Sequence, residues 1–261
     1  MNPDSTPSPA RSDAVVVDRV SYTYPGVPYG RTTLRDRLSR RGMRPTRTPV
    51  LRDVSFRAAP GHCLGIIGRN GVGKSTLLKL LVGALRPDAG DVTVNGRIAP
   101  IIGLGSGLHP EYDADANAVL IGTAMGNRLA DVRARLDEIM SFAGLTEHRH
   151  EPVRRYSSGM LARLSFAVAT MAQPDVLLID EVLGVGDHDF AVKARKRITE
   201  LMQGDTATIL VSHDLGSIRS LCDSALWLDE GRVGAYGTPT DVIGAYLDDW
   251  KRRQEGACTT N

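Results

Sequence analysis

The sequence predicts an α/β protein with a parallel sheet covered by helices, and three observations carry this prediction. Short β-rich segments alternate with helical segments along most of the chain, a pattern typical of parallel sheets with helices on their faces. One apolar segment, HCLGII, runs directly into the glycine-rich GRNGVGKST, and the helical run LLKLLVGAL follows it. Two later apolar segments, DVLLIDE and TATILVSHD, end in side chains that carry chemistry. Because open parallel sheets bind ligands at the carboxyl ends of their strands, these side chains are expected to face one crevice.

The first elements are expected to be two strands joined by an arginine-rich insertion. Residues 15–22 alternate weakly before a Pro-Gly pair, and LRDVSFR at 51–57 predicts the second strand. Within the insertion, TTLRDRLSRRG is expected to form a short amphipathic helix. Such a run is usually a solvated loop, but it also fits a patch that faces anionic lipid head groups or a phosphate-bearing substrate. Its arginines are Arg31, Arg35, Arg37, Arg40, Arg41, Arg44 and Arg47.

Three further regions complete the expected order of elements. Residues 91–102 return to strand-like alternation, and VKARKRITELM predicts a charged helix between the two later apolar strands. Residues 116–145 predict a helix, because five apolar side chains recur at helical spacing on one face. They are Val132, Leu136, Ile139, Met140 and Ala143.

Size and charge limit the classes of protein to consider. A chain of 261 residues with 42% apolar content can bury one domain, or a core domain with a smaller subdomain. The net charge of only +2 argues against a general nucleic-acid binder, so no nucleic-acid partner is expected. The longest apolar runs, such as 14–17 and 176–179, are far shorter than the roughly 20 residues that cross a bilayer.

The N-terminus and the cysteines point to a cytoplasmic protein. Residues 1–13 are rich in Pro and Ser and lack the apolar core of a signal peptide, so we expect a disordered leader. Cys63, Cys222 and Cys258 have no paired or metal-ligand spacing, which fits a reducing compartment.

The glycine-rich segment has the features of a phosphate-binding loop. Residues 68–75, GRNGVGKS, fit G-x-x-x-x-G-K-[ST] with a strand before and a helix after. Glycines let successive amides turn inward around phosphates, Lys74 is expected to reach the β and γ oxygens, and Ser75 to ligate Mg²⁺. A glycine-rich turn arising by chance is the alternative, and the flanking strand and helix argue against it.

Two strand ends supply candidate catalytic groups. Asp180 is expected to hold the Mg²⁺ shell beside the phosphate loop, and Glu181 to polarise a water for in-line attack on the γ-phosphate. Without the phosphate loop, two acids in this position would merely begin a loop. His213 follows another apolar strand, and its imidazole is expected to contact the γ-phosphate and the attacking water. Alone, it would be an ordinary surface or core histidine.

The segment YSSGM at 156–160 precedes a run of small and apolar residues. The simplest interpretation is that Ser157 or Ser158 caps the helix that follows. A serine and unpaired amides at a helix N-terminus also form an anion site, so Ser158 and Gly159 are expected to face a phosphate.

Together these motifs resemble the ATP-binding subunit of an ATP-binding-cassette (ABC) transporter, in the family's order and over residues 15–250. The resemblance implies a P-loop ATPase core with a parallel sheet, an antiparallel β subdomain and an inserted α-helical subdomain at about 106–172. It divides the chain into a leader at 1–13, an ATPase domain at 14–250 with the insertion at 27–49, and a polar tail at 251–261. It also implies ATP and Mg²⁺ as cofactors.

The resemblance also implies a role for each matching residue. Tyr24 matches the aromatic residue that stacks on adenine, and Asp187 the loop that crosses to a partner subunit. Asp180 and Ser75 match the metal ligands, Glu181 the catalytic base and His213 the switch histidine. The matching phosphate-loop residues are Gly68, Arg69, Asn70, Gly71, Val72, Gly73, Lys74, Ser75 and Thr76. The matching signature residues, which act on the ATP of the other subunit, are Ser157, Ser158, Gly159 and Met160.

Two departures from the family pattern stand out. Where the family usually has a glutamine that bonds Mg²⁺ and water, the matching residue is Gly103, which offers no side-chain ligand. Either water completes the metal shell, or the register differs and another group serves. The chain also ends soon after Trp250, so no carbohydrate-binding β-domain is expected to follow the ATPase, and export is expected to be coupled to synthesis.

One branch of the family matches in more detail. YSSGMLARLSFA followed by LLIDEVLGVGD is similar to subunits that export bacterial surface polysaccharides such as O-antigen, galactan or teichoic acid. This branch implies three partners: a second copy of the chain, a multi-helix membrane permease and a lipid-linked polysaccharide. It implies a peripheral location on the cytoplasmic face of the inner membrane. The arginine-rich insertion falls where the branch has an amphipathic segment, so we expect it to meet the lipid surface or the substrate's pyrophosphate-linked lipid head.

Other functions stay open at the level of sequence. The chain could serve a drug or lipid exporter of similar build, or act as a soluble nucleotide switch that transports nothing. Many such switches fuse two cassettes, and this chain holds one. A GTPase is disfavoured, because no Asn-Lys-x-Asp guanine-recognition motif occurs.

Overall fold

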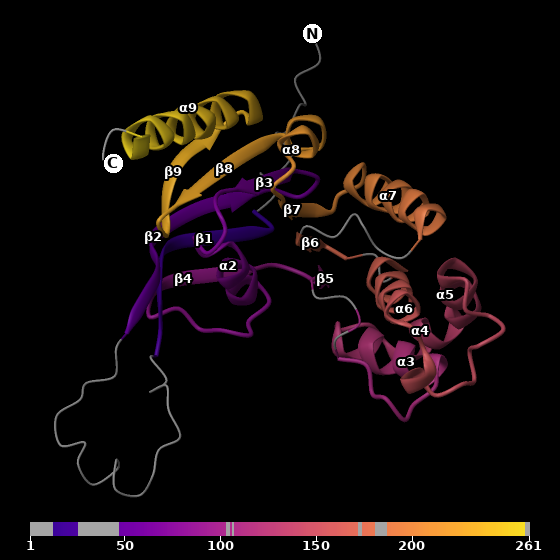
Figure 1. The fold of residues 1–261 in the computed structure, drawn as a ribbon. Coiled ribbons are helices and arrows are strands. Elements are labelled where there is room, and N and C mark those ends of the chain that lie inside the picture. Colours follow the sequence, from indigo (N-terminus) through magenta and orange to yellow (C-terminus); the bar gives the residue numbers. More distant parts are fainter. Residues whose placement is uncertain are drawn as a thin grey trace, which may run out of the picture.

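The computed structural model describes residues 13–25, 47–102, 105, 107–171, 174–180 and 187–258, with side chains as far as residue 255. In this part of the chain, two sheets and a group of helices form the fold (Figure 1). The expected leader lies outside the described residues except for Asp13, and so does most of the arginine-rich insertion.

The larger sheet is the mainly parallel one that the sequence predicts. Its strand order is β5-β6-β7-β3-β8-β9, and only the pair β8 and β9 is antiparallel. Strands β3 and β7 are buried along their whole length, because elements cover both faces of the sheet, and this explains their continuous apolar sequences. The strands are β3 (Cys63–Ile67), β5 (Ile98–Ile101), β6 (Val176–Asp180), β7 (Ala207–Val211), β8 (Ser224–Asp229) and β9 (Arg232–Gly237).

The smaller sheet is antiparallel and has the order β2-β1-β4. It packs with helix α2 on one face of the larger sheet, where alternate residues such as Leu64 and Ile66 enter a shared core. Its strands are β1 (Val15–Tyr24), β2 (Thr48–Ala58) and β4 (Ala89–Val94), and the helix is α2 (Lys74–Leu81).

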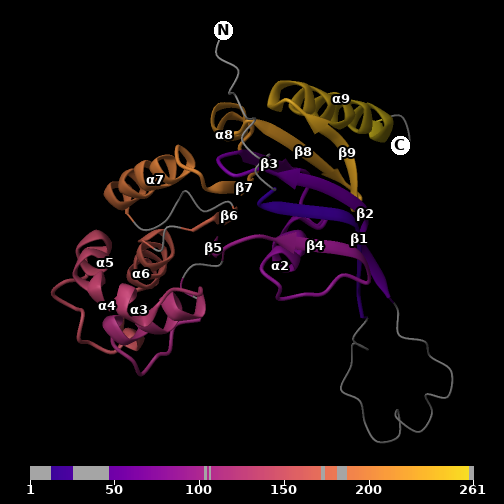
Figure 2. The same ribbon diagram turned by 180° about the vertical axis from the view of Figure 1, so that it is seen from behind.

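Three helices cover the other face of the larger sheet. Residues of opposite register, such as Ile67 and Leu177, pack there against these helices in a second core. The helices are α7 (His188–Met202), α8 (Leu215–Leu221) and α9 (Pro239–Cys258). Figure 2 shows α9 lying along β8 and β9, away from the helices that come between β5 and β6 in the sequence.

The remaining helices form a separate unit with its own core, between β5 and β6 in the sequence. Helix α6 leads from this unit back to β6 and the sheet, with only a short segment between them (Figure 1). The elements are α3 (Ala114–Ala124), α4 (Leu129–Ala134), α5 (Leu136–Ala143), a 3₁₀ turn (Val153–Arg155) and α6 (Ser158–Met171).

The structure corrects three predicted boundaries. Residues 116–145 form parts of three helices, because Gly126 adopts a φ of 87° after α3 and the chain breaks again at Arg135. Residues 91–102 contribute to two strands in different sheets, since Gly96 turns the chain with a φ of 106°. The expected tail at 251–261 begins inside α9, which continues to Cys258. The apolar face around Ile139 is nevertheless buried as its spacing predicts.

Two cysteines meet although their spacing gives no sign of it. The Sγ atoms of Cys63 and Cys222 lie 3.4 Å apart, and both residues are free thiols. The hydrogen bond to Cys222 and burial raise the pKa of the Cys63 thiol above its ordinary value. Neighbouring strands therefore bring together residues that lie far apart in the sequence.

Candidate functional site

The phosphate-loop segment lies between β3 and α2, as predicted, and two of its glycines are required by the backbone. Gly68 has a φ of 151°, and a Cβ there would lie 2.3 Å from the carbonyl oxygen of Leu228. Gly73 has a φ of 111°, and a Cβ there would lie 2.8 Å from Leu51. Side chains rarely adopt these angles, so the loop conformation depends on glycine.

The first turn of α2 provides an anion site. Gly73 is its N-cap and has no side chain that could accept from the first-turn amides, so these amides can donate to a ligand. Lys74 begins the helix and is only 7% exposed. Its Nζ donates to the carbonyl oxygens of Gly68 at 2.7 Å and Arg69 at 3.1 Å. The ammonium therefore lies within the turn of the loop, near the amides.

The strand register brings the other candidate groups to the same edge of the sheet. Asp180, the last residue of β6, pairs with Val211 at the end of β7. Val211 also pairs with Ile66 on β3, two residues before the loop begins. His213 follows β7 and is exposed, whereas Asp180 is half-buried. This edge therefore joins the phosphate-loop segment, the candidate metal ligand and the candidate switch histidine.

Asp214, next to His213, fixes the start of α8. Its carboxylate accepts from the amide of Gly216 at 3.0 Å and from the hydroxyl of Ser217 at 2.5 Å. These two hydrogen bonds, that of Ser217 first, hold the pKa of Asp214 below its ordinary value. The cap orients the chain that follows His213.

Tyr24 lies beside the first turn of α2. Its hydroxyl is 3.4 Å from Oγ1 of Thr76, and its half-buried ring meets Tyr22 edge to face, with centroids 5.0 Å apart. The aromatic ring is thus close to the phosphate loop, where the sequence predicts an adenine contact.

The signature segment begins helix α6, and the structure decides which serine caps it. Ser157 Oγ accepts from the amide of Met160 at 3.2 Å, whereas Ser158 is the first residue of the helix and is exposed. Tyr156 is buried and donates its hydroxyl to the carbonyl of His148 at 2.7 Å. Burial raises the pKa of Tyr156 to about 12. Tyr156 therefore anchors the segment, and Ser158 and Gly159 stand at its outer end.

Asp187 caps helix α7 and also contacts the signature helix. Its carboxylate accepts from the amide of Phe190 at 2.9 Å and lies 3.5 Å from the guanidinium of Arg163 on α6. No local sequence pattern marks Arg163, because its partner comes from a different element. The ion pair connects the helix of the signature to the start of α7.

Two residues of the sequence-based site cannot be placed. Glu181 and Gly103 lie outside the described residues. Their roles stay predictions that rest on the sequence alone.

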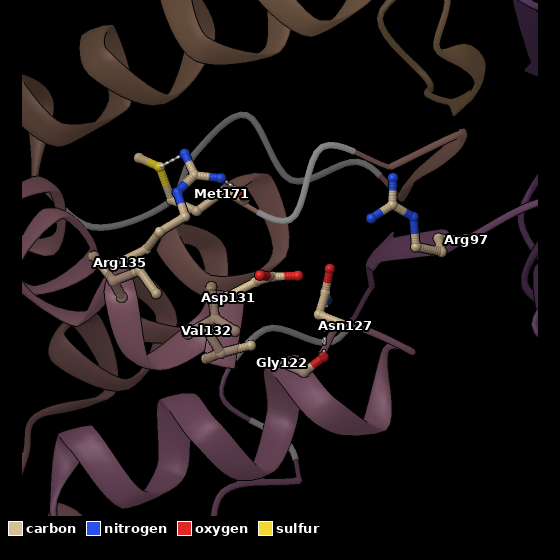
Figure 3. A pocket seen from close by; sticks show the side chains of 9 residues that line it. Arg97, Gly122, Asn127, Asp131, Val132, Arg135 and Met171 are labelled. Atoms are coloured by element: carbon tan, nitrogen blue, oxygen red, sulfur yellow. Dashed lines mark hydrogen bonds between the residues drawn. The ribbon is translucent and has the colours of Figure 1, made fainter. Parts of the chain in front are cut away.

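Two of the cavities in the described part of the chain border neither Asp180, His213 nor the signature segment. One of about 250 Å³ lies between α3, α4 and α6 (Figure 3). Asn127 and Asp131 project toward the same space there, with Arg97 across from them before β5, and Arg135 bonds to the carbonyl of Met171. None of the predicted site residues lines it.

The other cavity borders the phosphate loop and has a volume of about 440 Å³. Its walls include β2, the turn between β8 and β9, and the side chain of Arg253 from α9. Trp250, also on α9, lies under the guanidinium of Arg69. Nothing in the local sequence pattern links these two residues of α9 to the loop.

Comparison with known proteins identifies relatives for most of the chain. The sequence profile of the ABC transporter family matches residues 51–184. The O-antigen export system ATP-binding protein RfbB of Myxococcus xanthus is 44% identical over 83% of this chain and 51% of its own length. RfbB of Klebsiella pneumoniae is 41% identical over 76% of this chain and 80% of its own length. The chain therefore spans about half of the first relative and most of the second.

A teichoic acid protein and two solved structures are also similar. The teichoic acids export ATP-binding protein TagH of Lactococcus lactis is 37% identical over 76% of this chain and 42% of its own length. The solved structure of an ATP-binding subunit of an ABC transporter has a TM-score of 0.69 at 26% identity and covers 93% of both chains. A dimeric ATP-binding cassette with ADP and phosphate, at 20% identity and a TM-score of 0.68, shares the fold.

Proposed function

The chain belongs to the ABC transporter family, and on that premise we propose that it is an ATP-hydrolysing subunit that powers export of a lipid-linked cell-surface polysaccharide through a separate membrane permease. The phosphate loop carries the ATPase part of the proposal, since Lys74 and the first-turn amides of α2 converge where phosphates would lie. The export part is supported by relatives named for O-antigen and teichoic acid export.

In this proposal the chain binds ATP through its loop backbone. The amides at the start of α2 donate to the phosphate oxygens, and Lys74 moves from the carbonyls of Gly68 and Arg69 to the β and γ oxygens. Tyr24 stacks on the adenine from beside Thr76. The donor set fits a magnesium ion, with the hydroxyl of Ser75 and the carboxylate of Asp180 as ligands. Bound Mg²⁺ neutralises charge that develops on the phosphates.

Hydrolysis needs a group that activates water, and we assign this role to Glu181. Its neighbour in the sequence, Asp180, ends β6 at the edge of the sheet beside the phosphate loop, and this adjacency supports the assignment. His213, at the end of the neighbouring strand, holds the γ-phosphate and the attacking water in line. Gly103 carries no side chain and has no ligand role in this account.

The second half of each ATP site comes from another copy of the chain. Ser158 and Gly159 present their backbone at the start of α6, in the helical unit rather than beside α2 (Figure 1). We infer that two copies pair head to tail, so that this end of α6 meets the γ-phosphate bound by the partner. Asp187 pairs with Arg163 of α6. We assign Asp187 to the loop that crosses to the partner subunit, so this ion pair would connect that loop to the signature helix. Closure of the dimer drives the permease, and hydrolysis reopens it.

The proposal includes a location at the membrane surface. Among the described residues, no helix is long and apolar enough to cross a membrane. We propose a peripheral location on the cytoplasmic face of the inner membrane, where the permease holds the subunit. The insertion at 27–49 follows β1, and its last residues, Thr48 and Pro49, already begin β2 and pair with Tyr24 and Thr23. We assign its arginines to the lipid surface or to the pyrophosphate-linked head of the substrate.

Depletion of the protein in cells tests the transport function. We expect lipid-linked glycan to accumulate inside the cell and surface polysaccharide to be lost, and mass spectrometry of extracted lipids measures both. Unchanged glycan with impaired drug or lipid efflux would instead support an exporter of another substrate. Purification without any multi-helix membrane protein would support a nucleotide switch.

Charge reversal tests the insertion separately. Replacing Arg35, Arg37, Arg40 and Arg41 with Glu is expected to reduce export in cells and leave the ATPase activity of the purified subunit unchanged. Unchanged export would contradict the role of the insertion without affecting the ATPase proposal.

A further inference from the structure

We propose that Trp250 and Arg253 of helix α9 are positioning residues for ATP binding, because they hold the outer side of the phosphate loop through Arg69 and Asp229. This inference rests on the proposed assignment of residues 68–76 as the ATP site. Neither residue belongs to a motif that the sequence analysis singled out. Both come from the last turns of the C-terminal helix, far from the loop in sequence.

The first contact joins α9 to the loop directly. The guanidinium carbon of Arg69 lies 5.6 Å from the centroid of the Trp250 ring, which is the geometry of a cation–π interaction. The carbonyl of the same residue, Arg69, accepts from Lys74 Nζ at 3.1 Å. One residue thus links the indole outside the loop to the ammonium that is expected to bind the phosphates.

The second contact fixes the strand on which the loop rests. Arg253 forms ion pairs of 2.5 Å with Asp229, which ends β8, and with Asp249, one turn earlier on α9. Asp229 follows Leu228, whose carbonyl is the atom that a side chain at Gly68 would strike. Arg253 therefore secures the strand end against which the first residue of the loop packs.

The rest of α9 explains why these two contacts matter. Its first half is anchored by Val242 and Ile243, each 1% exposed, and by Tyr246, whose ring meets Trp227. Its second half is polar, with the sequence DDWKRRQE. Within this half, Trp250 contacts the loop and Arg253 pairs with the end of β8 and the turn that follows it. Their loss would loosen the end of the helix without removing its apolar anchor.

Arg253 also closes one side of a cavity. The space of about 440 Å³ beside residues 69–72 has Arg253 in its wall, with Asp229 and Glu230 next to it. A wall on this side restricts the loop to fewer conformations before ATP binds. Binding to a preorganised loop costs less conformational entropy, so the wall favours affinity rather than the chemical step. By linkage, bound ATP must stabilise the same contacts in return.

Kinetics of three variants provide the first test. Trp250→Ala is expected to raise the KM for ATP about two- to fivefold, the range of an exposed cation–π contact, with kcat nearly unchanged. Trp250→Phe keeps an aromatic face and should restore most of the affinity. Leu247→Ala removes another half-exposed side chain of α9 and serves as the matched control. An unchanged KM in Trp250→Ala, or an equal rise in the control, would overturn the proposal.

Fluorescence provides a test that does not depend on turnover. The sequence has two tryptophans, and Trp227 Nε1 has no hydrogen-bond partner among the described residues, so Trp227→Phe should preserve the fold and leave Trp250 as the reporter. We expect ATP to shift the emission of Trp250 in this variant, and Arg69→Ala to abolish the shift at saturating ATP. A Trp227→Phe protein that binds and hydrolyses ATP with no such shift would contradict the role of α9 alone. Failure of the wild type to hydrolyse ATP would contradict the proposed function instead.

Discussion

The phosphate loop and the signature segment both precede a helix N-terminus, but the structure holds them by different means. The loop before α2 depends on glycine conformations that side chains cannot adopt, and Gly73 leaves the first-turn amides without a side-chain cap. The segment before α6 is held by side chains, through the Ser157 cap and the buried Tyr156. One helix end therefore leaves its first-turn amides free of a side-chain cap, whereas the other is capped and anchored by side chains and exposes only Ser158 at its start.

Loss of the proposed catalytic base should have the largest effect, because it would act on the ATP that the phosphate loop binds and leave the signature segment unchanged. Glu181→Gln is expected to lower turnover by about 10²- to 10⁴-fold, the usual contribution of a general base, while ATP binding stays intact. The ATP-bound dimer should then accumulate in size-exclusion chromatography. Lys74→Ala is the matched variant that should weaken ATP binding itself. Normal turnover in Glu181→Gln would refute the base assignment.

A methyl group at Gly68 should damage the loop more than one at Gly71. At Gly68 the added Cβ meets the Leu228 carbonyl, whereas at Gly71 it meets nothing within 4 Å, although φ is 82° there. We expect Gly68→Ala to abolish ATP binding and to lower the midpoint of thermal unfolding. Gly71→Ala should lower the free energy of unfolding by about 1 kcal/mol, because only the left-handed backbone conformation disfavours a side chain there. Equal effects of the two substitutions would contradict a steric origin.

The signature cap can be removed without touching the loop. Ser157→Ala should lower the free energy of unfolding by about 1 kcal/mol, the usual value of an N-cap, and Ser158→Ala should not. Conversely, Ser158→Ala should weaken ATP-driven dimerisation more. Chemical denaturation and analytical ultracentrifugation measure the two effects. If Ser158→Ala were the more destabilising variant, the assignment of the cap would be wrong.

Ionisation of Tyr156 should affect stability only at high pH. Its pKa is about 12 in the folded protein against an ordinary value of 10.0, so the folded state binds the proton more tightly. The resulting stability is fully present below pH 10 and is lost as the pH rises toward 12. Tyr156→Phe should show a weaker loss of stability over this range in pH-dependent denaturation. An identical pH dependence of stability in the two proteins would show that the Tyr156 hydroxyl does not cause the loss.

The sequence predicts best those features that depend on neighbours along the chain. The strand, loop and helix around Gly68 follow from local patterns, as do the apolar strands before Asp180 and His213. The breaks at Gly96 and Gly126 were missed, because a glycine within an alternating or periodic segment does not show whether the chain turns there. The helical continuation of α9 was missed for a different reason, since its last turns have no apolar period.

Sequence patterns do not predict contacts between segments that lie far apart in the chain. The approach of Cys63 to Cys222 follows from the pairing of β3 with β8. The stacking of Arg69 on Trp250 and the ion pair of Arg163 with Asp187 need the packed helices. Each pair joins residues that carry no spacing signal, so only the folded chain reveals them.

The pairing of Tyr24 with Thr48 has a practical consequence for engineering. These residues face each other across an antiparallel pair, so the chain between them could be replaced by a short hairpin turn without altering the register of β1 and β2. Natural proteins could equally lengthen the segment there and keep the sheet intact. The two strands thus form a modular junction, bounded by the predicted adenine contact Tyr24, at which the intervening segment can be exchanged while the paired strands are retained.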